Sequence, residues 1–209
     1  ADTAGVEKEL IVVDDASSDN TPAVLIAMKR LQPQLKVLTS KRNLGKGNAI
    51  RRALAEATGD WVLVQDADLE YDPADYLGLL APALCGEATV VYGSRFLYWT
   101  KGARSGHRLF YWGNRFLTWC ANWLYGATLS DMYTCYKLVP ADLMRQMNLT
   151  SDGFEIEAEV TAKLLRRRIP IREVPISYAA RTRSEGKKVN FLDGLVALWT
   201  LLRFRWDRC

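Results

Sequence analysis

The sequence predicts an α/β fold in which a mixed, mainly parallel β-sheet is flanked by helices. Two observations predict it: short apolar, β-branched runs alternate with segments of helical periodicity, and polar clusters follow the ends of those runs. The chain has 209 residues, of which 49% are hydrophobic and 25% charged. That length and composition suit one continuous hydrophobic core, so we expect a single domain over residues 1–209.

The first half of the chain alternates strands with helices. Its predicted strands are residues 9–13, 36–39, 61–64 and 90–92. A first helix is expected from Thr21, which can cap it, with Pro22 in its first turn. A second helix follows Gly45-Lys46-Gly47 and ends before Gly59. Because ligands of such sheets gather where the strands end, the polar clusters at those ends are the candidate site.

The second half is more helical and aromatic. Residues 109–126 predict a helix with a row of aromatic side chains on one face, namely Trp112, Phe116, Trp119 and Trp123. Residues 155–168 predict a helix with acids in its first turns and arginines in its last, as the helix dipole favours. Residues 170–178 predict a strand and 191–206 a final amphipathic helix. The two aromatic helices fit either ordinary core or a surface in the lipid headgroup region.

Charge is unevenly distributed along the chain. The net charge is +4, but residues 166–209 carry 11 Lys and Arg against 4 Asp and Glu. This excess would attract nucleic acid, anionic lipid or a nucleotide diphosphate, and charge alone does not choose among them. Four cysteines without a C-x-x-C pair and a single His107 argue against a zinc site and favour a reducing, cytosolic-side setting. No apolar stretch is long enough to span a membrane, and no signal pattern begins the chain.

The strongest candidate for chemistry is Asp66-Ala67-Asp68, followed by Glu70. Two carboxylates two residues apart point the same way if the backbone stays extended, and they can hold Mg²⁺ or Mn²⁺ together with phosphate oxygens. An isolated D-x-D can also be a solvated acidic loop. Its position directly after a predicted strand favours a clamp for a nucleotide diphosphate.

A second polar cluster, D-D-A-S-S-D at residues 14–19, follows the first predicted strand. Its acids and hydroxyls can accept hydrogen bonds from a base or a ribose. The same residue types are those that helix-capping turns use, so both interpretations remain open.

Several linked motifs together resemble a known family. They are V-V-D-D-A-S-S-D-N-T, N-L-G-K-G-N-A, A-T-G-D-W-V-L-V-Q-D-A-D-L-E-Y-D-P, G-S-R-F, G-N-R-F, E-V-P-I-S-Y and R-T-R-S-E-G-K-K. In this order, from about Glu9 to Arg205, they resemble the dolichol-phosphate mannosyltransferase type of inverting glycosyltransferase, in glycosyltransferase family 2 with the GT-A fold.

The resemblance implies roles for individual residues. It implies catalytic roles for Asp68, Arg95, Arg115 and Asp131, the two arginines lying at a lipid phosphate. It implies metal ligands at Asp66, Asp68 and Glu70, with Mg²⁺ or Mn²⁺ as cofactor. It implies donor-binding positions at Asp15, Asp66, Ala67, Asp68, Arg181, Lys187 and Lys188, with Arg183 in the same basic loop. Glu157 and Glu159 would lie, with Asp131, in acceptor-side motifs.

The implied reaction transfers a hexose, with mannose favoured, from GDP-mannose or a UDP-hexose to a polyprenyl phosphate. The enzyme would work peripherally at the cytoplasmic face of a membrane, by direct contact or through a small membrane anchor subunit. Nucleic acid is not an expected partner.

The sequence departs from the family at its beginning. The family has a further strand and helix, with a P-x-Y-N-E type motif, before the segment that matches Glu9, whereas eight residues precede Glu9 here. We therefore expect a sheet that lacks a central strand, in a fragment or a naturally shortened form. Two alternatives stay open: a catalytically incompetent, membrane-associated binding subunit and a metal-dependent nucleotidyltransferase.

Overall fold

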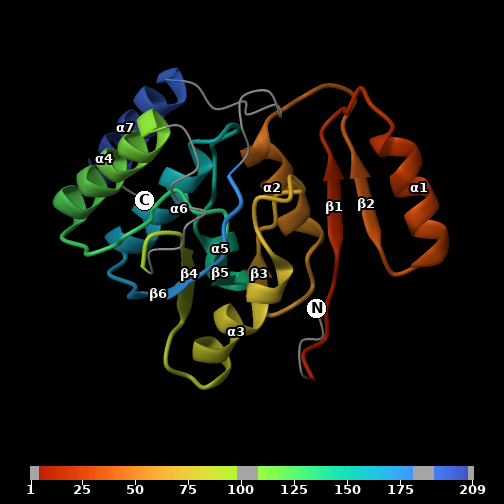
Figure 1. Ribbon diagram of the computed structural model, residues 1–209, viewed down its shortest axis with the longest axis horizontal. Helices are drawn as coiled ribbons and strands as arrows, with labels where there is room; N and C mark the ends of the chain where they lie inside the picture. Colours follow the sequence, from red (N-terminus) through yellow and green to blue (C-terminus); the bar gives the residue numbers. More distant parts are fainter. Residues whose placement is uncertain (1–4, 98–107, 181–190, 207–209) are drawn as a thin grey trace.

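The strands are divided between two sheets in the computed structural model, which describes residues 5–97, 108–180 and 191–206 (Figure 1). A parallel pair joins β1 (Ile11–Asp14) to β2 (Lys36–Thr39). The larger sheet has the strand order β3, β5, β4, β6. Its strands are β3 (Trp61–Leu63), β4 (Val90–Ser94), β5 (Lys137–Pro140) and β6 (Ile171–Pro175).

Strand β5 makes the larger sheet mixed. It runs antiparallel to both β3 and β4, whereas β4 and β6 are parallel. The sequence prediction missed β5, because four residues that start with Lys137 and end with Pro140 give a weak strand pattern. The predicted mixed α/β fold with flanking helices is confirmed, and β5 supplies the antiparallel part.

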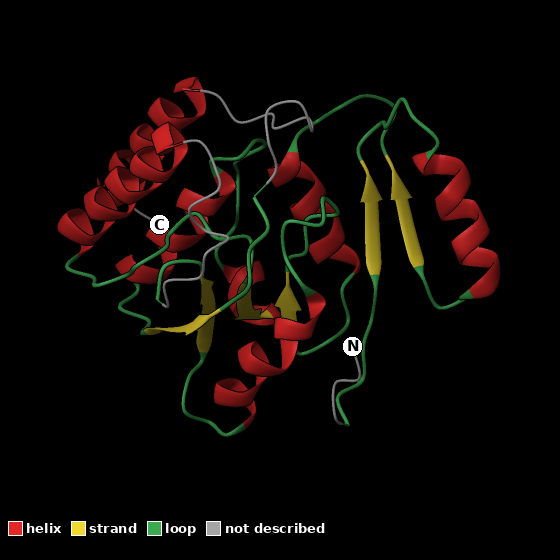
Figure 2. Cartoon of the chain, in the orientation of Figure 1, coloured by secondary structure: helices red, strands yellow, loops and turns green. Residues whose placement is uncertain are grey.

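The two sheets are linked by a helix instead of a strand. Among the described residues, β1 pairs only with β2 and β3 only with β5, so each has one edge without a strand partner. Figure 2 shows the two groups of strands apart from one another. Helix α2 (Lys46–Glu56) packs against β1, and its Leu54 also enters the core of the larger sheet. The expected incomplete sheet is therefore what the described residues form.

Helices cover both faces of the larger sheet. The remaining helices are α1 (Thr21–Leu31), a 3-10 turn (Pro73–Asp75), α3 (Tyr76–Leu84), α4 (Arg108–Tyr125), α5 (Ala141–Gln146), α6 (Ile156–Arg166) and α7 (Phe191–Trp206). One core cluster joins α2, α5 and α6 to strands β4 and β5, and a second packs α3 on the opposite face. A third cluster lies among α4, α6 and α7, which puts α4 and α7 side by side at one end of the molecule (Figure 1).

The predicted helices agree with the structure in position, and two further helices were missed. The start at Thr21 and the span 191–206 are confirmed, but Thr21 is the first residue of α1 and the cap position is occupied by Asn20. Helix α3 was missed because Gly78 and Pro82 lie inside it and lower its helix propensity. Helix α5 has only 6 residues, too few for a periodic pattern. No helix in the described part of the chain is both long and apolar enough to cross a membrane.

Candidate active site

The loop after β1 is fastened to the loop before α2 by Asp15. Its carboxylate accepts hydrogen bonds from the backbone N–H of Leu44, at 3.0 and 2.9 Å, and of Gly45, at 2.7 Å. The neighbouring Asp14 accepts from the Ser17 N–H at 3.0 Å. Asp15, predicted to recognise the nucleotide, organises the loop in this structure, and Asp14 holds a turn within it. At the start of α1 it is Asp19 that accepts from the Thr21 N–H, at 2.9 Å.

Of the four non-glycine residues in the left-handed region among the described residues, two lie in the polar loops and the other two, Asn148 and Arg168, follow helices. Ala16 has φ 62° in the loop after β1, and Leu69 has φ 61° in the loop after β3. Such conformations cost free energy and persist where the surroundings impose them, most often at functional sites. Both loops are the ones in which the sequence predicts ligand contacts.

The glycines of Gly45-Lys46-Gly47 allow α2 to approach the loop that precedes α6. A Cβ on Gly45 would lie 2.4 Å from the Asp152 carbonyl oxygen, and one on Gly47 would lie 2.2 Å from that of Ser151. Gly45 also has φ 95°, which disfavours other residues. The close approach brings Lys46, at the start of α2, beside α6.

Lys46 is the centre of a buried ion-pair chain. Its ammonium lies 2.7 Å from Asp66 Oδ2 and 2.9 Å from Glu157 Oε1. The other Glu157 oxygen pairs with Lys137, which also donates to the Thr134 carbonyl. Lys46 and Lys137 thus balance the carboxylates of Asp66 and Glu157, so this group of four side chains carries no net charge.

The pKa values within this chain follow its pairing. Burial opposes the charged form of Glu157, but Lys137 and Lys46 outweigh it and hold its pKa below the usual range. Burial likewise opposes the charged form of Lys46, and the carboxylates of Glu157 and Asp66 raise its pKa. Burial lowers the pKa of Lys137 despite its pairing with Glu157.

Arg95 forms a bidentate ion pair with Asp131. Its Nε lies 2.7 Å from Oδ2 and its Nη2 2.8 Å from Oδ1, while Asn114 donates to the same carboxylate at 3.2 Å. The Asp131 side chain is completely buried. Burial alone would raise the pKa of Asp131, but the Arg95 guanidinium lowers it. The carboxylate is therefore an ionised partner that fixes Arg95 in place.

Arg115 lies close to Arg95 but is exposed. Its Nη1 donates to the Ser130 carbonyl at 2.9 Å. The guanidinium carbons of Arg95 and Arg115 lie 5.5 and 5.8 Å from the centre of the Phe96 ring. The two arginines predicted to bind one phosphate are thus brought together around Phe96, with Arg115 the more accessible.

Tyr178 connects the arginines to the acidic loop. Its ring centre is 5.0 Å from the Arg95 guanidinium carbon, and its hydroxyl interacts with the Glu70 side chain. The adjacent Ala179 N–H donates to the Glu70 carbonyl at 2.9 Å. Tyr178 therefore contacts both Glu70, which follows Asp68 in the acidic loop, and Arg95 of the Arg95–Asp131 pair.

A family model decides the identity. The model described as Glycosyl transferase family 2 matches residues 4–142, which is more than half of the chain. The chain belongs to glycosyl transferase family 2. Both polar loops and the two arginine motifs, up to Asp131, fall inside the matched region.

Relatives of this family 2 domain are longer than it is. It is 28% identical over 194 residues to the low-salt glycan biosynthesis hexosyltransferase Agl6 of Haloferax volcanii, covering 93% of this chain and 44% of that protein. It is 33% identical over 138 residues to the glycosyltransferase AglJ of the same organism, covering 66% and 45%. It is 28% identical over 151 residues to the dodecaprenyl-phosphate galacturonate synthase of Rhizobium johnstonii, covering 69% and 41%. The domain thus spans less than half the length of these relatives.

Solved structures share its fold, which is that of GT-A glycosyltransferases. The glucosyl-3-phosphoglycerate synthase of Mycobacterium tuberculosis with uridine diphosphate has a TM-score of 0.69 at 22% identity, covering 96% of this chain and 70% of that one. The same enzyme with Mn²⁺, UDP-glucose and phosphoglyceric acid has a TM-score of 0.67 at 22% identity, covering 96% and 69%.

The acidic turn of this family 2 domain suits a cation shared with a substrate. No group of three or more His, Cys, Asp or Glu residues in the described part of the chain is arranged to hold a metal by itself. Asp66 is about one-third exposed, Asp68 accepts from the Glu70 N–H at 3.1 Å, and Glu70 turns toward Tyr178. Mg²⁺ bound through one or two carboxylates plus substrate phosphates needs no more than Asp66 and Asp68. The residues fit such a cation, and a preformed third ligand from Glu70 is not part of this structure.

Some predicted residues lie elsewhere. Glu159 accepts from the Thr150 and Ser151 N–H groups and pairs with Lys163, so it secures the start of α6. The predicted basic-loop residues Arg181, Arg183, Lys187 and Lys188 lie outside the described residues, as does His107, for which the sequence predicts no role.

Sequence reasoning missed Lys46, Lys137 and Glu173 as members of the site. The Glu173 carboxylate, on β6, accepts from the Ser130 N–H at 3.0 and 2.8 Å and from the Asp131 N–H at 3.0 Å. It therefore supports the turn that holds both arginines. The only sequence signal for Lys46 was its position between two glycines, and Glu173 had no signal beyond its place in E-V-P.

Proposed function

We propose that this domain transfers a hexose, with mannose as the expected sugar, from a nucleotide-diphosphate sugar to a polyprenyl phosphate at a membrane surface. One observation carries the proposal: Tyr178 contacts both Glu70, which lies in the same turn as Asp68, and the Arg95 guanidinium. The acidic side suits a donor diphosphate with Mg²⁺ or Mn²⁺, and the basic side suits an acceptor phosphate.

The reaction depends more on positioning of the acceptor phosphate than on a general base. A phosphate monoester is largely ionised near neutral pH, since its second pKa is about 6. One of its oxygens would form the new bond to C1 of the sugar as the bond from C1 to the donor diphosphate breaks, which inverts the configuration at C1. Arg115, with Arg95 behind it, is suited to hold the attacking phosphate. A bound divalent cation would stabilise the charge that develops on the departing nucleoside diphosphate.

Asp131 is a positioning residue in this scheme. Both of its oxygens accept hydrogen bonds from Arg95 or Asn114, and its carboxylate is completely buried. A base that removes a proton would need a free, accessible oxygen. The geometry supports a role through Arg95.

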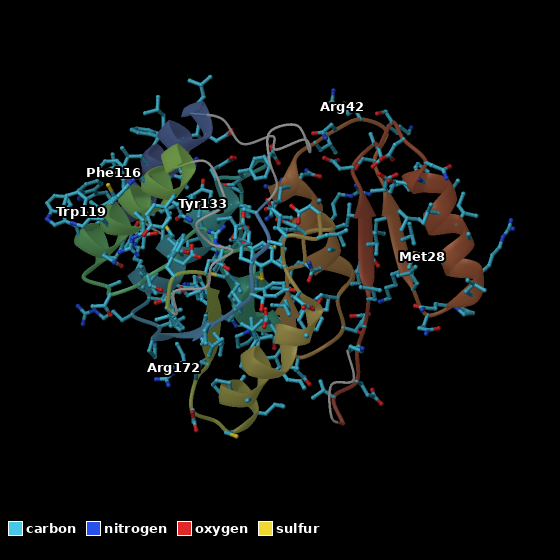
Figure 3. All side chains as sticks on the ribbon, in the orientation of Figure 1. Met28, Arg42, Phe116, Trp119, Tyr133 and Arg172 are labelled. Atoms are coloured by element: carbon cyan, nitrogen blue, oxygen red, sulfur yellow. The ribbon has the colours of Figure 1, made fainter. Side chains whose placement is uncertain are left out.

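The aromatic face of α4 supports the membrane part of the proposal. Trp112, Phe116, Trp119 and Trp123 are between 53% and 73% exposed, and Trp199 and Trp206 of α7 are 65% and 68% exposed. Figure 3 shows Phe116 and Trp119 at the outer side of α4. Tryptophan is favoured where water meets lipid, and Arg203 and Arg205 of α7 add positive charge for anionic headgroups. A peripheral contact through this face, or through a small anchor subunit on it, would bring Arg115 of the same helix to the lipid phosphate.

The name of one relative also supports a lipid acceptor. The galacturonate synthase of Rhizobium johnstonii is named for dodecaprenyl phosphate, which is a polyprenyl phosphate. The two Haloferax relatives are named only as a hexosyltransferase and a glycosyltransferase.

A transfer assay tests the function directly. Radiolabelled GDP-mannose, UDP-glucose and UDP-galacturonate would be incubated with dolichyl or undecaprenyl phosphate in detergent, with Mg²⁺, with Mn²⁺ or with EDTA. The assay would use both this chain and a version extended at its N-terminus. We expect label in the organic phase with one donor, dependent on the cation.

Control arms separate the alternatives. A parallel arm offers 3-phosphoglycerate, and label transferred there instead of to lipid would contradict the polyprenyl acceptor. Tight nucleotide-sugar binding without transfer in either version would favour a binding subunit. Release of pyrophosphate from a nucleoside triphosphate and a sugar phosphate would favour a nucleotidyltransferase.

A further inference from the structure

The acidic turn already has a cation beside it. The Lys46 ammonium lies 2.7 Å from Asp66 Oδ2, and its side chain is only 14% exposed. A divalent cation bound to the same oxygen would lie within a few ångströms of that ammonium. Because two cations so close together repel strongly outside bulk water, both cannot occupy Asp66 Oδ2 as the structure has them.

Glu157 offers Lys46 a second partner. Its Oε1 lies 2.9 Å from the same ammonium, but this buried oxygen receives no well-directed hydrogen bond. It therefore has free accepting capacity aimed at Lys46. Its second oxygen pairs with Lys137, which keeps the carboxylate ionised and fixed on α6.

Only the side chain of Lys46 needs to move between these partners. The flanking Gly45 and Gly47 pack directly on the carbonyls of Asp152 and Ser151, so the backbone at the start of α2 is held. The lysine stem has four rotatable bonds, and its ammonium can turn while both carboxylates stay within reach.

We propose that Lys46 is a built-in counter-ion. Its ammonium neutralises Asp66 when no divalent cation is bound, and it moves to pair with Glu157 alone when a cation binds. The inference rests on the cation site of the proposed function and adds a positioning residue to it. Lys46 would compete with the cation, and Glu157 would make the exchange possible by accepting the displaced charge.

Mn²⁺ binding tests the exchange without relying on activity. Free Mn²⁺ would be measured by electron paramagnetic resonance while the chain is titrated in the presence of UDP. Lys46→Met removes the competitor, so we expect Mn²⁺ to bind about tenfold more tightly. Glu157→Gln removes the second carboxylate and leaves Lys46 on Asp66, so we expect binding several-fold weaker than in the wild type. The opposite signs distinguish an exchange from general damage to the site.

The chain offers a matched control. Lys163, on α6, is buried like Lys46, but its ammonium pairs with Glu159 at 2.5 Å and donates to the Asn148 carbonyl at 2.9 Å, away from the acidic turn. Lys163→Met should leave Mn²⁺ affinity unchanged. The double variant Lys46→Met with Glu157→Gln should bind Mn²⁺ at least as tightly as the wild type. Lys46→Met leaves the Glu157–Lys137 pair intact, so its tighter binding of Mn²⁺ keeps the test decisive if the Glu157 variants unfold.

The possible outcomes distinguish failure of the Lys46 exchange from failure of the proposed transferase function. Lys46→Met with unchanged or weaker Mn²⁺ affinity would overturn the exchange and leave the transferase intact. Wild-type chain that transfers sugar in EDTA and binds no Mn²⁺ with UDP would remove the cation site and the exchange together, but not the transfer.

Discussion

At the scale of single residues, the charged side chains of the site fall into two groups: those buried in ion pairs and those accessible to solvent. Asp131 and Glu157 are buried and paired, and Arg95 is held by Asp131. Arg115 and the Asp66 side chain keep access to solvent. Substitutions of Asp131 and Arg95 should act mainly through stability, and substitutions of Arg115 and Asp66 mainly through substrate binding and turnover. Substitutions of Glu157 should affect the cation site as well as stability.

Asp68 is predicted to be essential for turnover and dispensable for folding. Asp68→Asn keeps an oxygen that can accept from the Glu70 N–H but removes the negative charge that a cation requires. We expect the transfer rate to fall by about 10²-fold or more, as for the loss of other charge-stabilising groups. Initial rates with saturating Mn²⁺ check this, with the thermal unfolding midpoint as the control. A rate within twofold of the wild type would remove Asp68 from the clamp.

Substitution of Arg115 is predicted to affect substrate binding, whereas substitution of Arg95 is predicted to affect stability. Arg115→Ala should raise the KM for polyprenyl phosphate much more than the KM for the nucleotide sugar, since Arg115 is exposed beside the acceptor side. Arg95→Ala should destabilise the fold by about 3–5 kcal/mol, because it leaves Asp131 buried and unpaired.

Steady-state kinetics and urea unfolding of both variants measure this contrast. Equal increases in both KM values for Arg115→Ala would contradict its acceptor role. If Arg95→Ala is as stable as the wild type, the buried Arg95–Asp131 ion pair, from which we infer that Asp131 is a positioning residue, would be contradicted.

At the scale of elements, most helices and strands could be predicted, but helices α3 and α5 and strand β5 could not. Alternation of apolar runs and helical periods depends on neighbouring residues, which is why 191–206 and the start at Thr21 were predicted correctly. Strand β5 exists because β3 and β4 present edges on both sides of it, and that information lies far away in the sequence. The same limit hid Lys46 and Glu173, whose partners Glu157 and Ser130 are distant along the chain.

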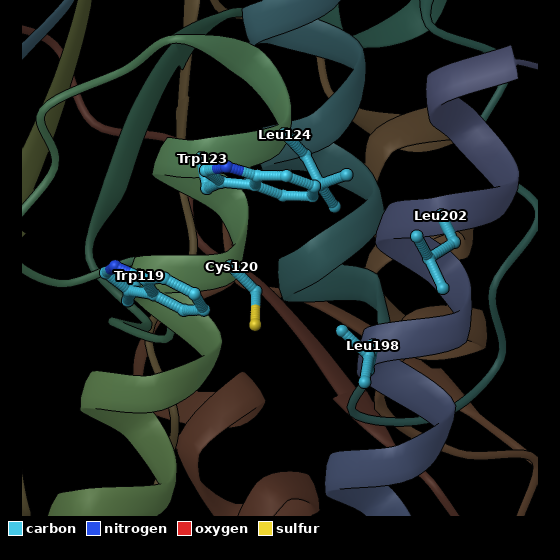
Figure 4. A pocket seen from close by; sticks show the side chains of 6 residues that line it. All are labelled: Trp119, Cys120, Trp123, Leu124, Leu198 and Leu202. Atoms are coloured by element: carbon cyan, nitrogen blue, oxygen red, sulfur yellow. The ribbon is translucent and has the colours of Figure 1, made fainter.

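Helices α4 and α7 together expose many large apolar side chains at one end of the molecule. An apolar hollow of about 170 Å³ lies between them, lined by side chains of both helices (Figure 4). The lining residues are Trp119, Cys120, Trp123, Leu124, Leu198 and Leu202. A surface of this kind is expected to be covered by another apolar phase or partner.

The double variant Trp119→Gln and Trp123→Gln is predicted to lose membrane binding. Both rings are well exposed, so the fold should tolerate the change, while binding to vesicles should weaken by about tenfold. Co-sedimentation with vesicles of phosphatidylcholine and phosphatidylglycerol measures this. The matched control is Ile26→Gln with Leu31→Gln on α1, whose side chains are 58% and 83% exposed at the opposite end of the molecule (Figure 1). Equal loss in both double variants would refute a specific membrane face.

At the scale of the whole molecule, polar contacts help to attach the small sheet to the rest, and Glu9 provides two of them through Thr58. Its carboxylate lies 2.5 Å from Lys36 Nζ and accepts from the Thr58 N–H at 2.8 Å and the Thr58 hydroxyl at 3.0 Å. Lys36 also donates to the Glu56 carbonyl at the end of α2 at 2.9 Å. Glu9 therefore joins β2 to the segment between α2 and β3, across the place where the sheet is divided.

This contact predicts a pH-dependent stability. The hydrogen bonds from Lys36 and Thr58 lower the pKa of Glu9 from 4.5 to about 2. A carboxylate with a depressed pKa adds stability above its unfolded value and loses it as the pH falls toward the folded value. Because Glu9 is partly solvated, we expect Glu9→Gln to cost only about 0.5–1 kcal/mol at pH 7.

Urea unfolding of wild type and Glu9→Gln at several pH values measures the difference. It should be constant above about pH 5.5 and should shrink between pH 4.5 and 2, in the window set by the two pKa values. Lys36→Met should remove most of the same difference, because the hydrogen bond from Lys36 is the largest cause of the lowered pKa. A difference between wild type and Glu9→Gln that stays constant down to pH 2 would mean that Glu9 does not join the two sheets through its charge.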